Sequence, residues 1–499
     1  MKTLIVIAAF TPQALWKRPL GNRTLDLWVE AAARQALPEA EIVWLGPHDS
    51  MGVPQEWFKD RRWVAIEEGP AGVETVVERL TSGFDELVWL WADEPLVRPE
   101  LITRLLELHR DYRAEYTFAD GFPQGLAPEV LDPKIIPTLR SFAQKETARR
   151  PRPWWFLLVS RDINAFDVET ELSPVDLRME RLSFRADSLR NFVLLERWQE
   201  RASGDLKQFL EALRSNPVQH RTLPATLLVQ ISAGVLQAPL WSPLLQFRPQ
   251  ALNARDFLDL DVFSSWVASA AEWAGGLTVM PSFWCEPSLH PDFLNLARRA
   301  WAVPGVRLVV ETSGLGWKDD DLIILSKEAE GRLDWIVELD SNVETTYAQI
   351  RGEGFAEAQA ATHRLIELFP GHVWPQTVRM NETEEETESF YRFWKEKAGQ
   401  AIILKYNFFG GTLPQRKPAD LSPWKRHPCW HLQRDLAVFL DGKVVPCRDA
   451  LDRHLILGQA GVESWETIWK AGESAFARHA QQDYPEVCRL CDEYYTFFF

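Results

Sequence analysis

The sequence predicts an α/β protein with three domains, and three observations lead to this prediction. Segments typical of buried strands alternate with segments of helical periodicity, first in the N-terminal 220 residues and again between residues 226 and 405. Prolines mark a boundary between these two regions, at residues 217–224. Four of the five cysteines gather at residues 429–491. We therefore expect domains at residues 1–220, 221–406 and 407–499.

The composition is that of a globular protein with more than one domain. A chain of 499 residues exceeds what one hydrophobic core usually serves, and 46% hydrophobic with 25% charged residues is typical of folded domains. Its 55 basic and 71 acidic residues give a net charge of −16, which disfavours binding to a phosphate backbone. We therefore expect no nucleic acid partner.

We expect a cytoplasmic protein with no membrane-spanning segment. The start, MKTLIVIAAFTPQ, has a short apolar run without a small-residue cleavage site, so a buried strand is expected there rather than a signal peptide. No uninterrupted apolar stretch approaches the roughly 18 residues that a membrane-spanning helix needs. Five cysteines are an odd and low count for a secreted protein of this length, so a disulfide framework is not expected.

The first domain is expected to hold a Rossmann-like parallel sheet. Residues 4–9, 41–45 and 86–91 have the pattern of strands. Helical patterns follow them, as at residues 24–37, which end before a proline. Such alternation of strands and helices builds a parallel α/β sheet.

The second domain is expected to be a partial (β/α)6 barrel. Its six candidate strands are at residues 226–231, 276–280, 306–311, 335–339, 372–379 and 401–405. Parallel strands joined by crossover helices present functional residues at their carboxyl ends. The segments that follow these strands are therefore the candidate functional positions of the barrel.

The third domain is short and rich in cysteine, so a metal is expected to organise it. Its Asp441-Gly442 dipeptide suits a two-residue hairpin turn, which would pair Leu440 with Lys443. The hairpin would thereby bring Cys447 back toward Cys429.

The four clustered cysteines form an array of the type C-x12-G-x4-C…C-x2-C. Its members are Cys429, Gly442, Cys447, Cys488 and Cys491. Thiolates are the ligands of soft metal sites, and four of them close either a tetrahedral zinc site or a [4Fe–4S] cluster. A cluster, a zinc ion and four buried free thiols are the alternatives that the spacing leaves open. Cys285 stands apart and is expected to be a small buried residue.

Residues 425–495 resemble the SPASM domain, an auxiliary iron–sulfur module of radical S-adenosylmethionine (SAM) enzymes. The cysteine array carries the resemblance, together with Leu457-Gly458, Glu463-Ser464 and Ile468-Trp469 between its halves. It implies one [4Fe–4S] cluster bound by the four cysteines of the array. The seven-cysteine form of the domain has further ligands after Cys491, where this chain ends in TFFF, so one cluster rather than two is expected.

The second domain resembles a radical SAM barrel over residues 225–405. The FWCEPSLHPD segment at residues 283–292 is similar to the G-G-E-P segment after the second barrel strand, and residues 311–314 are similar to the E-T-N-G segment after the third. A match after the fourth strand comprises residues 337–340, Tyr347 and Arg351-Gly352. The resemblance implies that the Glu286 carboxylate would meet the amino group of SAM.

The barrel departs from that family at its defining C-x3-C-x2-C motif. The three cysteine positions fall on Val235, Pro239 and Ser242, so the SAM-binding cluster cannot be held and reductive cleavage of SAM is not expected. Cys285 also replaces the last glycine of the G-E-P turn, where a close approach of the backbone to SAM favours no side chain. We therefore favour a structural role for Glu286, and keep as an alternative that another molecule occupies the barrel mouth.

The first domain resembles the cytidylyltransferase-like proteins of polysaccharide synthesis. The resemblance is carried by D-x-P-L and F-P-x-G-x-x-x-E-V patterns within residues 85–130. It implies a nucleotidyltransferase-like fold and a nucleotide site in which Asp93 binds a metal ion. The second metal-binding carboxylate of that family falls on Arg185, and a cation at this position opposes the binding of Mg²⁺.

The phosphate-binding loop of those enzymes is also altered in this chain. Residues 10–18 contain no glycine and place Trp16 where the phosphates should pass. Lys17 and Arg18 remain candidates for attracting an anionic sugar nucleotide, with a solvated basic pair as the alternative.

The order of the three parts, with residues 405–436 and the ending CRLCDEYYTFFF, is similar to the group called spiro-SPASM proteins. Our first hypothesis is an iron–sulfur protein of radical SAM lineage that lacks its own SAM-cleaving cluster and acts as a binding or partner subunit for a protein or peptide. The second is an active maturation enzyme or glycan- or sugar-nucleotide-modifying enzyme, and the third is a zinc-stapled scaffold. The sequence leaves open whether the chain is an enzyme, because both sets of catalytic motifs are degenerate.

Overall fold

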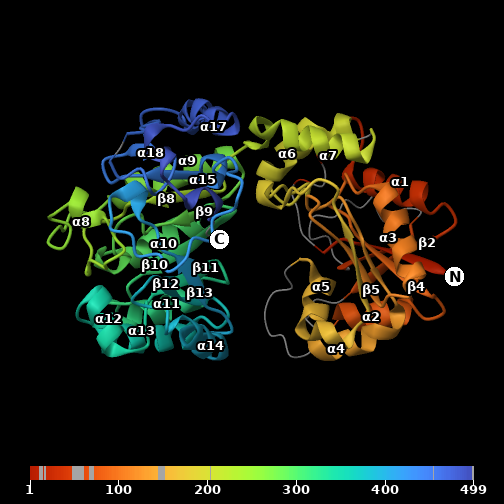
Figure 1. The fold of residues 1–499 in the computed structure, drawn as a ribbon, viewed down its shortest axis with the longest axis horizontal. Coiled ribbons are helices and arrows are strands. Elements are labelled where there is room, and N and C mark those ends of the chain that lie inside the picture. Colours follow the sequence, from red (N-terminus) through yellow and green to blue (C-terminus); the bar gives the residue numbers. More distant parts are fainter. Residues whose placement is uncertain are drawn as a thin grey trace. The chain divides into compact units, whose positions relative to one another are not determined.

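The computed structural model consists of two compact units, Met1–Thr222 and Leu223–Phe499. The structure describes residues 1–10, 15, 18–47, 61–66, 72–143, 152–202, 204–452 and 454–496. Figure 1 shows unit 1 in red to yellow and unit 2 in green to blue. Each unit has its own sheet with helices packed on it, which confirms the predicted α/β class.

Unit 1 is built on a mostly parallel sheet, whose described strands have the order β3-β2-β1-β4-β6-β5-β7. The strands are β1 (Thr3–Ala8), β2 (Glu41–Pro47), β3 (Trp63–Ile66), β4 (Glu86–Trp91), β5 (Tyr116–Asp120), β6 (Glu129–Leu131) and β7 (Val168–Leu172). β1 pairs in parallel with β2 and β4, which agrees with the predicted parallel sheet. β6 is antiparallel to both of its neighbours, β4 and β5.

Two layers of helices cover the two faces of this sheet. The helices are α1 (Leu25–Ala36), α2 (Gly72–Leu80), α3 (Pro99–Asp111), α4 (Ile136–Ala143), α5 (Trp154–Val159), α6 (Leu189–Ala202) and α7 (Leu206–Ser215). Ile5 and Ile7 of β1 lie in the core that α1, α3, α6 and α7 cover, whereas Leu4 and Val6 lie in the core that α2, α4 and α5 cover (Figure 1). Because β1 is buried on both faces, its residues are apolar without alternation.

Unit 2 contains the predicted series of parallel strands. Its described strands are β8 (Thr226–Val229), β9 (Leu277–Met280), β10 (Val306–Thr312), β11 (Leu333–Glu338), β12 (Val373–Arg379), β13 (Ile402–Lys405), β14 (Asp435–Val438), β15 (Lys443–Val445) and β16 (Gly458–Gln459). β8 to β13 pair in parallel in chain order, which confirms the predicted partial barrel of six strands. The whole sheet has the order β13-β12-β11-β10-β9-β8-β14-β15-β16.

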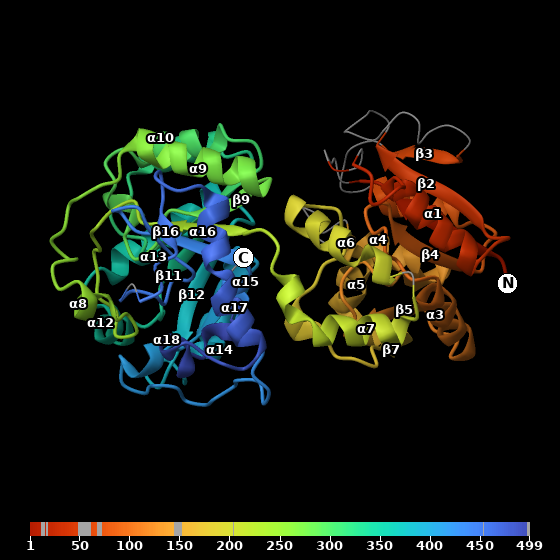
Figure 2. The same cartoon turned by 90° about the horizontal axis from the view of Figure 1, so that it is seen from above.

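The described helices of unit 2 are α8 (Leu244–Phe247), α9 (Leu260–Ala274), α10 (Phe293–Trp301), α11 (Asp319–Glu328), α12 (Glu344–Arg351), α13 (Phe355–Leu368), α14 (Thr387–Ala398), α15 (Trp430–Arg434), α16 (Trp465–Ala471), α17 (Glu473–Ala480) and α18 (Glu486–Arg489). Of these, α9 to α14 and α16 contribute to the apolar core on the outer face of the sheet. α9 and α10 lie side by side (Figure 2) and share one apolar core with the outward residues Leu227 and Val229 of β8. Leu228 points into a second core on the inner face. Among the described residues, no helix is long and apolar enough to cross a bilayer.

The expected third domain shares the barrel sheet. β14 pairs in parallel with β8, and β15 and β16 continue the sheet by antiparallel pairing. The segment after residue 406 therefore belongs to the same compact unit as the barrel. α15 and α17 of this segment pack against each other in unit 2 (Figure 1).

The β14–β15 hairpin forms, but its predicted register is wrong by one residue. Val438 pairs with Val444, and the Phe439 N–H donates to the Lys443 carbonyl, so the loop has three residues rather than two. The Gly442 N–H donates to the Phe439 carbonyl, and Gly442 has a φ of 82°. A glycine at positive φ suits this longer loop as well as the two-residue turn, so the Asp-Gly dipeptide does not distinguish the two.

A buried ionic network lies where β14 joins β8. The Asp435 carboxylate accepts hydrogen bonds from Arg434 Nε at 2.7 Å and from His431 Nδ1 at 2.6 Å. Arg434 Nη2 donates to Thr226 Oγ1 of β8 at 2.6 Å. Burial by itself would raise the pKa of Asp435, but Arg434 and His431 outweigh burial and lower this pKa to about 2.

We expect Asp435→Asn to lower the free energy of unfolding at pH 7 by about 2–3 kcal/mol, measured by urea denaturation. Because the folded-state pKa is depressed, the carboxylate's contribution is complete above pH 5 and declines as the pH falls toward 2. The difference between variant and wild type should therefore be the same at pH 7.5 and pH 5 and smaller at pH 3.5. Asp320→Asn, at an exposed position of α11, is the control and should change stability by less than about 0.5 kcal/mol.

Candidate metal centre and barrel mouth

The four cysteines of the array line one cavity in unit 2. Cys429 directly precedes α15 and Cys447 follows β15, so the β14–β15 hairpin brings these two residues to the same cavity. Cys488 lies in α18, and Cys491 follows the end of that helix. Cys285, the remaining cysteine, is buried in the wall of a different cavity.

Burial keeps these four thiols protonated in the absence of a cation. It raises the pKa of Cys429 to about 12 and that of Cys488 to about 11, and the pKa values of Cys447 and Cys491 lie well above the usual range. Mutual repulsion between the thiolates, and with Asp449, adds to the effect of burial. A bound metal centre supplies the compensating positive charge and displaces the protons, so the donor set fits a metal centre.

The spacing of the side chains bears on the kind of metal centre. Within the part of the chain that the structure describes, no group of three or more His, Cys, Asp or Glu side chains is placed to hold a metal ion. Zinc would need all four sulfurs at about 2.3 Å from one ion. A four-iron cluster binds each thiolate to a different iron and therefore accepts sulfurs that lie farther apart. Four cysteines around a shared cavity are the donor set that either kind of centre would use.

Polar contacts hold the segment that carries Cys488 and Cys491. Arg426 donates to the carbonyls of Cys488 at 2.6 Å and of Arg489 at 3.1 Å. The Glu493 N–H donates to Cys491 Sγ at 3.4 Å. Backbone N–H groups directed at cysteine sulfurs stabilise the thiolate form, and such contacts tune iron–sulfur clusters.

A second cavity, of about 110 Å³, lies at the carboxyl ends of the barrel strands. Val235, Pro239 and Ser242, the positions that correspond to the missing cysteines, line it. The barrel mouth therefore has room for a small molecule, but none of these three side chains supplies a thiolate.

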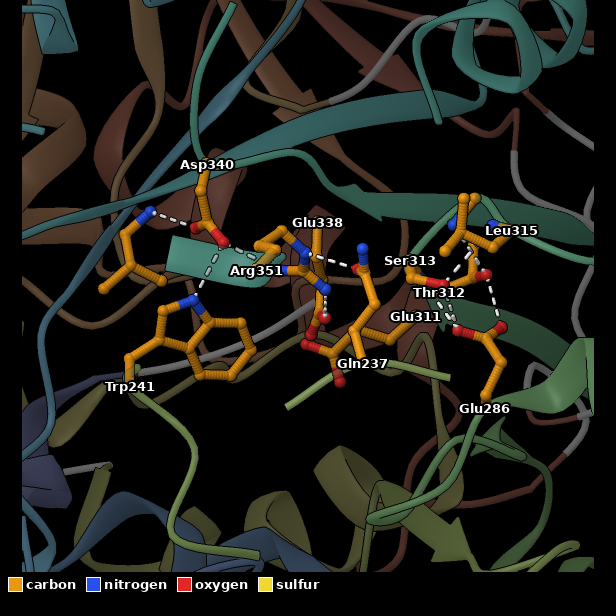
Figure 3. A network of polar contacts seen from close by, with 12 residues as sticks. Gln237, Trp241, Glu286, Glu311, Thr312, Ser313, Leu315, Glu338, Asp340 and Arg351 are labelled. Carbon is orange, nitrogen blue, oxygen red and sulfur yellow. Dashed lines mark hydrogen bonds and ion pairs between the residues drawn. The ribbon is translucent and has the colours of Figure 1, made fainter. Parts of the chain in front are cut away.

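Glu286 lines this second cavity and accepts hydrogen bonds from neighbouring residues of the protein. Its carboxylate accepts hydrogen bonds from Thr312 Oγ1 at 2.6 Å, from Ser313 Oγ at 2.6 Å and from the Ser313 N–H at 2.9 Å (Figure 3). Burial raises the pKa of Glu286, and the bonds from Ser313 and Thr312 oppose this effect. Protein donors thus occupy the carboxylate that the family resemblance assigns to the amino group of SAM, and the structural role remains our prediction.

The charged residues of the barrel mouth are also paired. Arg351 lies between Asp340, at 2.7 Å, and Glu338, at 3.1 Å, and donates to Gln237 Oε1 at 2.9 Å (Figure 3). Burial raises the pKa of Glu338 although Arg351 opposes the shift. One guanidinium therefore faces two carboxylates on this side of the cavity.

Arg448 connects the barrel mouth with the cysteine cavity. Its guanidinium pairs with Glu311, at the end of β10, at 2.7 Å, and its carbonyl accepts from Trp284 Nε1 at 2.7 Å. Arg448, Asp449 and Glu493 line both cavities. Sequence reasoning did not find Arg448, because only its place directly after Cys447 sets it apart from other arginines.

In unit 1, cations accompany the carboxylates of the expected nucleotide site. Asp93, 1% exposed, pairs with Arg152 at 2.7 Å, and the neighbouring Glu94 pairs with Arg185 at 3.0 Å. Arg152 also stacks on the Trp91 ring at 3.8 Å. Arg185, the position predicted to oppose the binding of Mg²⁺, therefore forms an ion pair beside Asp93. The role of Asp93 in binding a metal stays a prediction.

Part of the expected phosphate loop falls outside the described residues. Trp16 and Lys17 lie there. Arg18 is described and pairs with Glu196 on the surface at 3.0 Å.

Comparison with known proteins defines the class of the C-terminal region. Residues 429–492 match the model of the SPASM family, described as an iron–sulfur cluster-binding domain. The match begins at the first cysteine of the array and ends just after the last. The C-terminal part of the chain is thus similar to the SPASM iron–sulfur domains.

A protein of Treponema pallidum (strain Nichols) is similar to this chain over most of its length. That protein, which is uncharacterized, is 33% identical over 357 residues, a match that covers 69% of this chain and 98% of the relative. This chain belongs to the same protein family. A second uncharacterized protein of the same organism is 42% identical over 55 residues, which cover 11% of this chain and 25% of that protein.

Solved structures show weaker likenesses. Streptococcus suis SuiB bound to the precursor peptide SuiA is 12% identical with a TM-score of 0.43, covering 53% of this chain and 70% of SuiB. A cytidylyltransferase from Leptospira borgpetersenii is 16% identical with a TM-score of 0.37, covering 44% of this chain and 96% of the enzyme. At such scores the likenesses carry no argument, and the fold assignment depends on the strand order described above.

We expect Glu286→Ala to lower the free energy of unfolding by about 3 kcal/mol or more, because it leaves the buried donors of Thr312 and Ser313 without an acceptor. Glu286→Gln, which keeps one acceptor oxygen, should cost less. Exposed Glu344→Ala is the control and should change stability by less than about 0.5 kcal/mol. Urea denaturation measures all three variants, and near-wild-type stability of Glu286→Ala would contradict a structural role.

Proposed function

We propose that this protein is an iron–sulfur protein of radical SAM lineage that has no SAM-cleaving cluster of its own and acts as a binding or partner subunit. One [4Fe–4S] cluster is bound by Cys429, Cys447, Cys488 and Cys491. The observation that carries the proposal is that these four cysteines line one cavity within the region that matches the SPASM family.

A cluster accounts for the cysteine cavity better than zinc does. The thiols surround a shared cavity, and the described side chains do not converge on a position for a metal ion. Such a cluster accepts and releases single electrons. The chain's own contribution is to bury the thiolates and to direct the Glu493 N–H at Cys491. None of the five cysteines is in a disulfide, which is consistent with the reducing cytoplasm that we propose as the location.

The radical SAM lineage is supported by the barrel and its motifs together. Six parallel strands pair in chain order, and the FWCEPSLHPD segment follows the second of them at the cavity. The loss of SAM chemistry is supported by Val235, Pro239 and Ser242, which cannot ligate iron in place of cysteine. The engagement of Glu286 by Thr312 supports the same conclusion.

A binding role is supported by unused hydrogen-bonding capacity in the barrel mouth. Gln376 is 1% exposed and lines that cavity, and neither its amide oxygen nor its amide nitrogen has a partner among the described residues. A buried amide without partners is costly, so a ligand or ordered water that meets both atoms is favoured there. A protein or peptide remains the partner that we propose for the chain as a whole.

Anaerobically reconstituted wild-type protein should be brown, absorb at roughly 400 nm and contain about four irons and four sulfides per chain. Cys488→Ser should lose most of this iron and sulfide, because a hydroxyl is a poor ligand for the cluster. Cys285→Ser is the matched control, since Cys285 is also buried in unit 2 but lines the other cavity, and it should keep the full content. Iron, sulfide and zinc are quantified together, and a colourless protein with one zinc per chain would exclude the cluster.

The iron-loaded, reduced protein should produce no 5′-deoxyadenosine from SAM, because no cluster in the barrel can pass an electron to the sulfonium. Liquid chromatography with mass spectrometry measures the product, with a reaction lacking reductant as the blank. Product that rises above this blank and is proportional to protein concentration would show that the barrel retains SAM chemistry.

A further inference from the structure

His479 is a buried histidine in the wall of the cysteine cavity. It lies on α17, is 2% exposed and lines the cavity together with the four cysteines. Neither ring nitrogen has a hydrogen-bond partner within the described ranges of the chain. Buried polar groups normally have partners, so two unused nitrogens beside a predicted metal centre call for an explanation.

The helix directs this side chain toward the cysteines. Ala475 and Phe476, on the same face of α17, pack in one apolar cluster with Cys429. His479 is four and three residues farther along the helix, so it lies on the face that is turned to the cavity. The ring is also held in place from outside the cavity, because Tyr484 contacts it edge to face at 5.0 Å between ring centroids.

Contacts around Tyr484 connect His479 to the segment that carries Cys488. Arg426 stacks on the Tyr484 ring at 3.9 Å and donates to the Cys488 carbonyl at 2.6 Å. The imidazole and one predicted ligand are therefore positioned by the same pair of side chains.

The ring is neutral at physiological pH. Burial lowers the pKa of His479 to about 4, and the positive charges of Arg426 and Arg478 act in the same direction. A neutral imidazole carries one N–H donor and one acceptor nitrogen. His431, which also lines the cavity, differs because its Nδ1 is hydrogen-bonded to Asp435 at 2.6 Å.

We propose that His479 donates its ring N–H to a sulfur of the cluster and thereby raises the cluster's reduction potential. The inference depends on the proposed [4Fe–4S] cluster. Reduction adds negative charge that is spread over the sulfurs, and a hydrogen-bond donor stabilises this charge more than it stabilises the oxidised form. His479 thus acts as a positioning residue that tunes the metal centre through its sulfur atoms rather than as an iron ligand.

The test compares three variants of the full-length, iron-loaded protein. His479→Phe keeps a ring of similar size without the N–H, and His479→Gln keeps a donor. His290→Phe is the control, because His290 is also buried in unit 2 but is hydrogen-bonded to the Leu258 carbonyl and lines neither cavity. Iron and sulfide are quantified first, and dye-mediated redox titration followed by electron paramagnetic resonance then measures the midpoint potential.

The midpoint potential should fall in His479→Phe, fall less in His479→Gln and stay unchanged in His290→Phe. The reduced wild-type cluster should also show a hyperfine coupling to an exchangeable proton and to histidine ¹⁵N that His479→Phe lacks. A fully loaded His479→Phe protein with the wild-type potential would overturn the inference.

Two further outcomes keep the inference separate from the proposed function. If His479→Phe cannot be loaded with iron, the absence of the ¹⁵N coupling in wild type would by itself overturn the proposal, and its presence would support it. If wild type takes up no iron and sulfide at all, the proposed function fails, and the role of His479 fails with it. If only the proposed role of His479 is overturned, the proposed cluster is unaffected.

Discussion

The parallel pairing of β14 with β8 is the contact on which the rest of unit 2 depends. The Ala225 N–H donates to the Arg434 carbonyl at 2.7 Å, and the Gln230 N–H donates to the Val438 carbonyl at 2.9 Å. These bonds make the cysteine-rich segment part of the barrel sheet. Because β15 then returns beside β14, the hairpin delivers the second cysteine of the array to the cavity that the first one lines.

The same pairing places a charged residue between the two cavities. Arg448 follows Cys447 directly and reaches Glu311 at the end of β10, so one side chain contacts the barrel mouth from the wall of the metal centre. Leaving either member of such a buried pair alone would cost about 3–5 kcal/mol, which makes the two sites structurally interdependent. A ligand in the barrel mouth would therefore lie against residues that also surround the cysteines.

Local patterns in the sequence predicted much of the fold and the chemistry of the site. Buried apolar runs identified β1 and β4, and the cysteine spacing identified the four residues that line one cavity. The hairpin register was wrong by one residue, because Asp441-Gly442 suits turns of two lengths and the dipeptide alone does not select between them. The buried histidine of α17 gave no signal, since a lone histidine in a helical pattern has many possible roles.

The sequence by itself determined which chemistry is available: four thiols at ligand spacing near the end of the chain, and no thiol at the three positions where a barrel cluster would need one. The tertiary structure alone decided the partners of the buried charges. Glu311 and Arg448 are 137 residues apart, and Asp93 and Arg152 are 59 residues apart. The physical reason is that strand and turn patterns depend on neighbouring residues, whereas the partner of a buried charge depends on which strand ends and loops the sheet brings together.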